Sequence, residues 1–378
     1  MRLHEYEAKK LFQKQSIATP TGAVARSKEE AEQIARQMGK PVVVKAQVLV
    51  GGRGKAGGIE FAETPQQAGQ AAGRLLKEKI KGERIEEVLV EERLMIEREL
   101  YVGITVDGAA GAPLVMVSLE GGIDIEVTAA RHPERIASHH LDIFRGLQPY
   151  ETRKLVKDLG LGGEVGAKVA DIVYKLYRLF EQYDTLIAEI NPLVITQGGA
   201  VVAVDAVFEM DDSALYRHAE FGGLALERIS DPLAREGQNL GVSYVGLDGN
   251  IGVICSGAGL GMATIDLIGR WGKPANFLET GGGITEKLMA GAMRLVLKKP
   301  GLQGILINLY GGINPIHEGA KGIAKVIRED RVNVPVVAKA LGNFQEETWQ
   351  TLEEAGVTVI KTIDTEGAVE ELFRRVKR

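Results

Sequence analysis

The sequence predicts a two-domain protein: an α+β region built mostly from antiparallel strands, followed by a doubly wound parallel α/β sheet. Its 378 residues exceed the length of one typical domain. Before about residue 240, strand-like and helical segments mix without strict alternation, whereas after it they alternate regularly. Glycine contributes 47 residues, so many close approaches of backbone are expected.

Composition excludes several classes of protein. A 45% hydrophobic and 26% charged content is typical of globular proteins. The net charge of -5 argues against a nucleic-acid binder. The single cysteine, Cys255, excludes an internal disulfide and a cysteine-rich zinc site and fits a reducing compartment. The first ten residues lack the apolar core of a secretory signal, and no apolar run could span a bilayer. We therefore expect a cytoplasmic protein with no nucleic-acid or membrane partner.

Local signals predict the elements of the first region in order. Residues 4–13 have helical spacing, and Ser27 with Glu30 is a capping-box pattern that opens a helix over 27–39. Thr64 and Pro65 open another helix, because proline is tolerated in the first turn. A further helix is expected at 164–183, and strand patterns occur at 41–50, 86–94, 99–108, 113–119, 185–196 and 200–209.

The second region repeats one unit, a buried strand followed by a helix. Strands are expected at 250–257, 275–280, 304–312, 334–342 and 357–363, and helices at 260–271, 284–299, 315–329, 343–356 and 366–378. Five such units in succession predict a parallel, doubly wound sheet. The polar stretch 227–241 is the expected linker.

A glycine-rich stretch follows the strand that ends at Lys45, with glycines at positions 51, 52, 54, 57 and 58. Such backbone can turn several N–H groups into one space, and Lys45, Arg53 and Lys55 would help this nest to bind phosphate. It is not a Walker A loop, because Leu49 stands where the first glycine must be and Ala56 follows the lysine. A flexible hairpin is the alternative.

Three oxygen-bearing side chains lie on two successive strand patterns: Glu189, Asn191 and Asp205. Glu189 and Asn191 are two residues apart, so they would share a strand face. Pairing of the two runs could bring Asp205 beside Asn191. One or two protein oxygens together with substrate phosphates are typical of Mg²⁺ sites. A polar surface hairpin is the alternative, but the combination with the glycine-rich stretch favours a nucleoside triphosphate site.

In the second region three glycine-rich loops follow strands, at 256–261, 280–283 and 310–315. The carboxyl edge of an open parallel sheet is where ligands bind, with helix N-termini facing anions. The dinucleotide-binding fingerprint nearly fits at Gly257, Gly259 and Glu279, but Met262 replaces its third glycine. Each loop alone could be a sharp turn, whereas three together predict a carboxylate or phosphate site.

Several motifs resemble one family, the β subunit of succinate–CoA ligase: LHEYEAKKLF, VVKAQVLVGGRGKAGG, EINPLV, LDGNIG, GAGLGMAT, PANFLETGGG and NLYGGI. The resemblance runs along the whole chain in the same order. It implies an N-terminal ATP-grasp domain at 1–236 and a C-terminal flavodoxin-like domain at 237–378. It also implies an α-subunit partner that binds CoA and carries a phosphorylated histidine, with ATP or ADP and Mg²⁺, and a small dicarboxylic acid as substrate. GTP is the alternative nucleotide.

Carried over motif by motif, the resemblance implies roles for individual residues. The nucleotide contacts would be Lys45, Gly52, Arg53, Gly54, Glu91, Leu94 and Glu99. Glu189 would be the catalytic carboxylate near the visiting phosphohistidine, and Asn191 and Asp205 the Mg²⁺ ligands. The acid would be bound by Ser256, Gly312, Ile313 and Asn314.

Departures from the family pattern leave the identity of the acid open. Ser256 stands where the family usually has asparagine, and Asn314-Pro315 follows Gly312-Ile313. A malate–CoA or similar dicarboxylate–CoA ligase is therefore an alternative to a succinate enzyme. The sequence also leaves open a non-catalytic nucleotide-binding subunit and a stand-alone ligase without a partner. His317 is a candidate phosphorylated nucleophile, but its place one turn inside a helix favours an ordinary helix residue.

Overall fold

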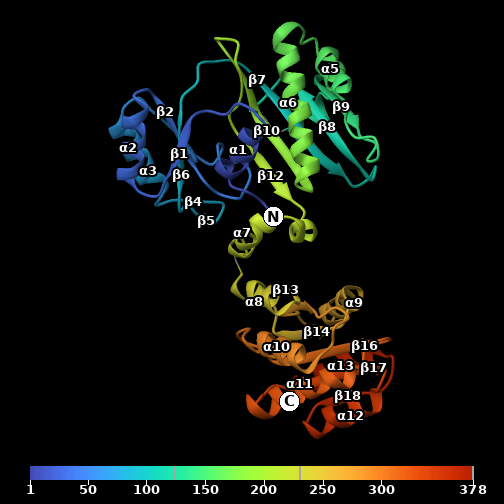
Figure 1. Ribbon diagram of the computed structural model, residues 1–378. Helices are drawn as coiled ribbons and strands as arrows, with labels where there is room; N and C mark the ends of the chain where they lie inside the picture. The colour runs from blue at the N-terminus through green and yellow to red at the C-terminus, as the bar shows by residue number, and fades with distance from the viewer. Residues whose placement is uncertain (123–124, 230, 377–378) are drawn as a thin grey trace. The chain divides into compact units, whose positions relative to one another are not determined.

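The computed structural model describes residues 1–122, 125–229 and 231–376, and it divides the chain into two compact units, Met1–Ala225 and Leu226–Arg378 (Figure 1). The boundary expected between residues 236 and 237 lies inside helix α8 (Pro232–Leu240). Asp231 caps this helix by accepting a hydrogen bond from the Leu233 N–H at 2.8 Å, and Gly241 ends it in the left-handed conformation. Residues 232–240 of the expected linker therefore form a capped helix that belongs to the second unit.

The first sheet of the N-terminal unit is antiparallel and has the order β1-β6-β2-β3. Its strands are β1 (Gly22–Ala25), β2 (Val42–Ala46), β3 (Ile59–Ala62) and β6 (Val88–Glu92), and helices α2 (Lys28–Met38) and α3 (Pro65–Leu75) cover one face. Both helices begin as predicted, since Ser27 and Thr64 accept hydrogen bonds from the third residue along. A short hairpin, whose strands β4 (Lys79–Ile80) and β5 (Glu83–Arg84) have two residues each, follows α3 in the chain.

Successive side chains along β2 point alternately to the face packed under α2 and α3 and to the opposite face. Val42 and Val44 belong to the core under α2 and α3. Lys45, one residue further, therefore projects from the other face of the sheet. The strand predicted at 41–50 ends at Ala46, and the glycine-rich stretch begins soon after it.

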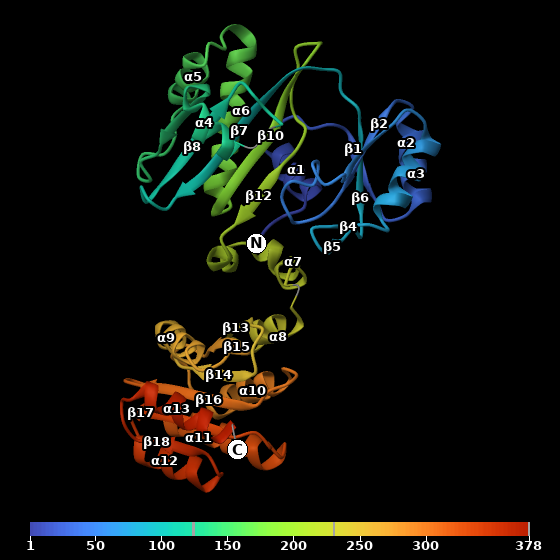
Figure 2. The same ribbon diagram turned by 180° about the vertical axis from the view of Figure 1, so that it is seen from behind.

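The second sheet of this unit has the order β11-β10-β7-β8-β9, with β12 also paired to β10. Its strands are β7 (Ile96–Asp107), β8 (Ala112–Ser118), β9 (Ile136–His140), β10 (Thr185–Thr196), β11 (Val201–Ala203) and β12 (Val207–Met210). Helices α5 (Pro149–Asp158) and α6 (Gly163–Gln182) pack against it (Figure 2). All of its pairs are antiparallel, as predicted. The single strand expected at 200–209 is instead two strands, interrupted at residues 204–206.

Helix α1 (Glu5–Lys14) anchors the start of the chain to the core of the second sheet. Ala8 and Phe12 are fully buried, and the Phe12 ring meets the Phe208 ring edge-on with centroids 6.5 Å apart. The remaining short elements of this unit are α4 (Ile125–Arg131), α7 (Gly222–Glu227, which ends beyond the unit boundary) and 3-10 turns at Pro133–Arg135, Asp212–Arg217 and Ala219–Phe221.

The C-terminal unit is the predicted doubly wound sheet, with the order β13-β15-β14-β16-β17-β18. Five strands are parallel: β14 (Ile251–Cys255), β15 (Asn276–Glu279), β16 (Gly304–Gly311), β17 (Val336–Gly342) and β18 (Thr358–Ile360). One core packs under α9 (Ala258–Gly269) and α13 (Thr365–Val376), and the other under α10 (Glu286–Leu297), α11 (Ile316–Glu329) and α12 (Gln345–Glu354). Strand β13 (Ser243–Gly246), antiparallel to β15, has no counterpart among the predicted strands.

No helix in the described parts of the chain combines the length and apolar character needed to cross a bilayer.

Candidate functional site

A buried cluster of six charged side chains lies where the two sheets of the N-terminal unit meet α1. It comprises Glu5, Lys9, Lys45, Arg53, Glu91 and Asp205, and we call it the charge cluster. The Lys45 ammonium lies 2.9 Å from a carboxylate oxygen of Glu5 and 2.9 Å from one of Glu91. The Arg53 guanidinium contacts Glu5 and donates to Asp205 at 2.8 Å. The structure thus brings three predicted nucleotide-site residues and one predicted metal ligand together.

One backbone carbonyl ties the cluster to the interruption between β11 and β12. The Val204 oxygen accepts hydrogen bonds from Lys9 at 2.7 Å and from Lys45 at 2.6 Å. Asp205 is the next residue, so the two ammonium groups fix the backbone that carries its carboxylate. Val204 stands opposite Pro192, which has no N–H to donate, so the Val204 carbonyl is available to the two lysines where the ladder breaks.

The pKa values show how strongly these groups interact. Burial disfavours the Glu5 carboxylate, but Arg53, Lys45 and Lys9 more than offset it and hold the pKa of Glu5 well below its ordinary value. Burial likewise disfavours the Lys45 ammonium, yet the nearby carboxylates raise its pKa. For Lys9, burial dominates and lowers the pKa. Ion pairing therefore outweighs the cost of burying the charged forms of Glu5 and Lys45.

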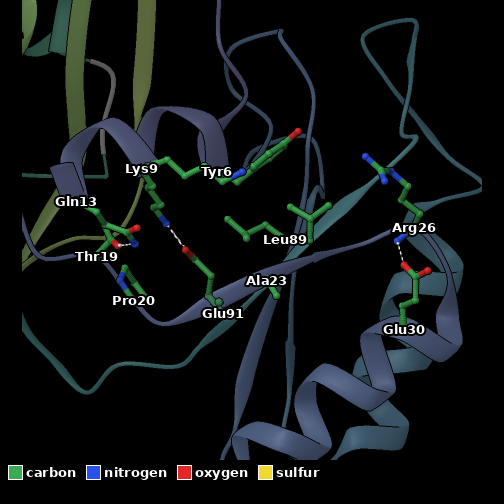
Figure 3. Close-up of a pocket in the computed structure, with 13 residues that line it drawn as sticks. Tyr6, Lys9, Gln13, Thr19, Pro20, Ala23, Arg26, Glu30, Leu89 and Glu91 are labelled. Carbon is green, nitrogen blue, oxygen red and sulfur yellow. Dashed lines mark hydrogen bonds and ion pairs between the residues drawn. The ribbon is translucent and has the colours of Figure 1, made fainter. Parts of the chain in front are cut away.

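A cavity of about 490 Å³ adjoins the charge cluster and shares Lys9 and Glu91 with it (Figure 3). It lies between α1 and the face of the first sheet that α2 and α3 leave free. Its lining includes Tyr6 from α1 and Leu89 from β6, and Gly22 has no side chain that would enter it. A Cβ at Gly22 would stand 2.6 Å from the Glu91 side chain, so this glycine lets Glu91 lie flat against β1. An apolar wall beside ionised groups suits a nucleoside.

The glycine-rich stretch is the connection between the antiparallel strands β2 and β3, and it folds back on itself in turns. Gly52 adopts a left-handed φ of 76°, and the Gly58 N–H donates to the Arg53 carbonyl at 2.9 Å. This turn points the Arg53 side chain inward, where it also donates to the Ala46 carbonyl at 2.9 Å. The backbone of Gly52 and Gly54 stays exposed. The stretch therefore presents both a buried guanidinium and open backbone for phosphate.

Three further predicted nucleotide contacts, Glu91, Leu94 and Glu99, are placed differently. Glu91 lies on β6, is buried and lines the cavity. Leu94 lies in the connection from β6 to β7, and Glu99 is exposed on β7 opposite Val194. Neither of these two residues lines the cavity.

Glu189 and Asn191 lie on β10, and Asp205 lies between β11 and β12, the two strands that pair with β10 on one side. Glu189 pairs with Val207 and Gly103, while the Val204 N–H donates to the Pro192 carbonyl at 3.1 Å. The residues between these contacts, 190–192 and 204–206, therefore face one another. However, the β10 register shifts between Ile190 and Leu193, so simple alternation does not fix where Asn191 points. The Asn191-Pro192 peptide bond is cis.

The donor set fits a hard divalent ion. The Asp205 carboxylate is 28% exposed, and the Asn191 amide supplies a second oxygen type that Mg²⁺ accepts. Within residues 1–122, 125–229 and 231–376, no three His, Cys, Asp or Glu side chains group as a metal site. The few protein oxygens would therefore be completed by phosphates and water. The Asn191 amide oxygen accepts a hydrogen bond from the Gly122 N–H at 2.7 Å, a contact that the sequence did not indicate.

The predicted acid-binding residues lie at the carboxyl edge of the second unit's sheet. Strands β14 and β16 are neighbours, but the chain leaves them toward opposite faces, into α9 and α11. Ser256 follows β14 and bridges the resulting crevice: its hydroxyl accepts from the Tyr310 N–H at 2.8 Å and donates to the Tyr310 carbonyl at 3.3 Å. Such a crevice is the usual ligand position in open α/β sheets.

The loop at Gly312, Ile313 and Asn314 is held from two sides. Asn314 approaches Gly282, where a Cβ would stand 3.2 Å from its amide nitrogen. Asn343, after β17, donates its side-chain amide to the carbonyls of Gly312 and Ile313, both at 3.1 Å. With their carbonyls bound by Asn343, these residues have backbone N–H groups left to face an anion. Sequence reasoning did not identify Asn343.

His317 and Cys255 have side chains of reactive types, but their surroundings indicate structural roles. His317 is the second residue of α11, its Nε2 lies 3.1 Å from a Glu318 carboxylate oxygen, and its ring packs on Phe344 with centroids 4.6 Å apart. Cys255 is fully buried in β14, and burial raises the pKa of its thiol to about 11.

Sequence reasoning also missed Glu5 and Lys9, for which a signal exists. They are one helical turn apart and share a face with the buried Ala8 and Phe12. Charged residues on the apolar face of a helix are rarely buried without partners. The N-terminal helix pattern therefore contained the hint of a buried ionic contact.

Comparison with known proteins agrees with this layout. The family described as "ATP-grasp domain" matches residues 2–195, and the one described as "CoA-ligase" matches residues 254–372. The GDP-forming succinate–CoA ligase subunit beta of Thermus thermophilus is 45% identical over 363 residues, which are 96% of this chain and 96% of the relative. The ADP-forming succinate–CoA ligase subunit beta of Methanothermobacter thermautotrophicus is 43% identical and covers 94% of each chain.

A solved structure shares the fold. ATP citrate lyase from Methanothrix soehngenii, in complex with citrate and coenzyme A, aligns with a TM-score of 0.73 at 18% identity and covers 95% of each chain. The order of an ATP-grasp domain and a flavodoxin-like CoA-ligase domain, with full-length relatives above 40% identity, shows that this chain belongs to the succinate–CoA ligase β-subunit family.

Proposed function

We propose that the chain is the β subunit of an enzyme that interconverts succinate, CoA and ATP with succinyl-CoA, ADP and phosphate. The observation that supports this most directly is the charge cluster, in which Lys45 and Arg53 stand beside Asp205. A polyphosphate and its divalent ion need such a set of cations next to a carboxylate. The names of full-length relatives support the reaction class, and both ADP-forming and GDP-forming relatives leave the base to be tested.

The proposed chemistry divides between two subunits. A carboxylate is a poor acyl donor, so the γ-phosphoryl group is used to convert it to an acyl phosphate that the CoA thiol can attack. The phosphoryl group would be carried by a histidine of an α subunit, with Glu189 close to it at the nucleotide site. Mg²⁺, held by Asn191 and Asp205, would offset the charge of the polyphosphate.

On the side of this chain, the residues bind and orient. Lys45, Arg53 and the open backbone of Gly52 and Gly54 would hold the phosphates, and Glu91 and the adjoining cavity the nucleoside. Leu94, in the connection from β6 to β7, and Glu99, on β7, stay part of the proposal as nucleotide contacts. In the second unit, Ser256 and the loop of Gly312, Ile313 and Asn314 would bind the acid through backbone N–H groups.

The experiment that tests this proposal is reconstitution of the chain with its cognate α subunit. Formation of ADP from ATP, or of GDP from GTP, is measured with CoA and succinate, then with malate and citrate. Turnover with a dicarboxylic acid that requires both subunits supports the proposal, and the best acid and nucleotide define the substrate. No turnover with any dicarboxylic acid would contradict it and favour a non-catalytic nucleotide-binding subunit.

A cytoplasmic location is part of the proposal and depends on the single cysteine.

A further inference from the structure

We propose that Glu5 is a positioning residue of the nucleotide site: its carboxylate holds Lys45 and Arg53 in place for a polyphosphate while Asp205 changes partner. This inference rests on the proposed function, in which the nucleotide is bound at Lys45, Arg53 and Asp205. Glu5 has no assigned role in that proposal.

Glu5 contacts all three cations of the charge cluster. One carboxylate oxygen lies 2.6 Å from the Lys9 ammonium and 2.9 Å from that of Lys45, and the other contacts the Arg53 guanidinium. The residue is 4% exposed, so these contacts are shielded from water. Charge-assisted hydrogen bonds of this kind fix the direction of a long side chain. Without Glu5, Lys45 and Arg53 would each lose the partner that they share.

The Glu5 side chain is enclosed on all sides, whereas the Asp205 side chain is partly exposed. Glu5 lies in the first turn of α1, where the helix dipole favours a carboxylate, and the same helix face carries Ala8 and Phe12 into the core. Asp205 lies in the interruption between β11 and β12, and its side chain is 28% exposed. When a divalent ion attracts a carboxylate away from Arg53, Asp205 can therefore turn toward it and Glu5 cannot.

The charges of the cluster support this division of roles. Lys9, Lys45 and Arg53 carry three positive charges, and Glu5, Glu91 and Asp205 carry three negative ones. The cluster is therefore neutral while Arg53 and Asp205 are paired. Once Asp205 turns to a cation, the remaining groups carry one positive charge toward the phosphates. Arg53 keeps its position, because Glu5 and the Ala46 carbonyl still hold it.

Lys9 connects this group of side chains to Asp205, the residue expected to bind the metal. It bridges Glu5 and Glu91 and donates to the Val204 carbonyl, so it links the phosphate-binding cations to the backbone of Asp205. The helix α1 thus contributes a carboxylate and an ammonium one turn apart, each directed to a different half of the site.

The opposite role would be competition, in which the Glu5 carboxylate occupies the place of a phosphate. The two roles predict opposite signs for Glu5→Gln. If Glu5 competes, its loss leaves excess positive charge and ADP binds more tightly. If Glu5 positions Lys45 and Arg53, its loss lets them turn away and ADP binds more weakly.

The test is calorimetric titration of the full chain with ADP and Mg²⁺, alone and with its α subunit. For Glu5→Gln we expect the Kd for ADP to rise by about tenfold or more, the scale of one charge-assisted hydrogen bond. Glu5→Asp keeps the charge but shortens the reach, and we expect a smaller rise. The matched control is Glu92→Gln, which removes a carboxylate at the end of β6 that pairs with Lys40, and it should change the Kd by less than about twofold.

The outcomes separate the two proposals. An unchanged or lower Kd in Glu5→Gln overturns the positioning role and leaves nucleotide binding intact. If that variant does not fold, as judged by circular dichroism, an unchanged Kd in Glu5→Asp overturns the role in the same way. Absence of ADP binding by the unaltered chain overturns the proposed function and, with it, the inference about Glu5.

Discussion

Arg53 and Asp205 are separated by 152 positions in the sequence, yet the guanidinium donates to the carboxylate at 2.8 Å. This ion pair joins the glycine-rich stretch to the interruption between β11 and β12. Both groups have a second use in the proposed function, one for phosphate and one for a divalent ion. Nucleotide and metal should therefore bind interdependently. A phosphate that binds Arg53 frees Asp205 for the ion, and an ion that binds Asp205 frees Arg53 for the phosphate.

Removal of the metal tests this interdependence. We expect EDTA to weaken ADP binding to the unaltered chain by about tenfold or more, since Arg53 then stays paired with Asp205. In Asp205→Asn the pair is weakened, so Mg²⁺ should change the Kd for ADP much less. Titrations with and without Mg²⁺ measure both effects. A variant that keeps the full Mg²⁺ dependence would show that Asp205 does not hold the ion.

Asn343→Ala should weaken binding of the acid without affecting the nucleotide. The change removes two hydrogen bonds to the carbonyls of Gly312 and Ile313, worth about 1 kcal/mol each. We expect the KM for the dicarboxylic acid to rise by about five- to tenfold while the Kd for ADP stays constant. Asn250→Ala is the control, because its side chain bonds Gln303 and it lies just before β14, at the amino end of the strand. Equal effects on acid and nucleotide would contradict the assignment.

Gly103→Ala should destabilise the N-terminal unit. A Cβ at Gly103 would stand 2.2 Å from the hydroxyl oxygen of Tyr101, whose ring is buried over that glycine. Displacing a packed aromatic ring costs about 1–3 kcal/mol of unfolding free energy. Urea denaturation measures the change, and Gly108→Ala, where a Cβ has open space, is the control. Equal stability of the two variants would show that the ring moves freely.

Acidification should unfold the protein partly through Glu5. The pKa of Glu5 in the folded chain lies well below its ordinary value, so its ion pairs stabilise the fold above that ordinary value. This stability is lost as the pH falls through the folded pKa, because the unfolded chain binds a proton first. Thermal unfolding between pH 6 and pH 3 should therefore show a steeper loss for the unaltered chain than for Glu5→Gln. Parallel curves would contradict this.

Cys255 should resist alkylation in the native protein. It is fully buried, and a pKa of about 11 leaves about one thiol in a thousand ionised at pH 8. We expect iodoacetamide at pH 8 to modify it only after unfolding in urea, as followed by mass spectrometry. Rapid modification of the folded chain would show that β14 opens.

Periodicity and capping residues predicted most of the elements, because those signals are local. Ser27, Thr64 and the five strand–helix units act within a few residues, so the sequence suffices to place them. The interruption at 204–206 has no such signal. It lies opposite Pro192, which cannot donate to the ladder, and the Val204 carbonyl instead binds Lys9 and Lys45, which come from elsewhere in the chain.

The candidate site shows the same limit. Motif resemblance indicated Lys45, Arg53 and Asp205 as separate ligands. It could not show that Glu5 pairs with Lys45 and Arg53, or that Arg53 pairs directly with Asp205. Asn343 has no signal of its own, because a lone asparagine after a strand is typical of any turn. Long-range pairing of charged groups depends on tertiary packing, which local spacing does not record.

The sheet of the C-terminal unit ends on both sides in a short strand, the four residues of β13 and the three of β18. Long bare edges recruit extended segments of other chains, whereas edges this short offer few unpaired backbone groups to a newcomer. A partner protein would thus gain little by adding a strand here. Recognition of this unit should depend on side chains and loop amides, and exposure of the sheet edges should not drive aggregation.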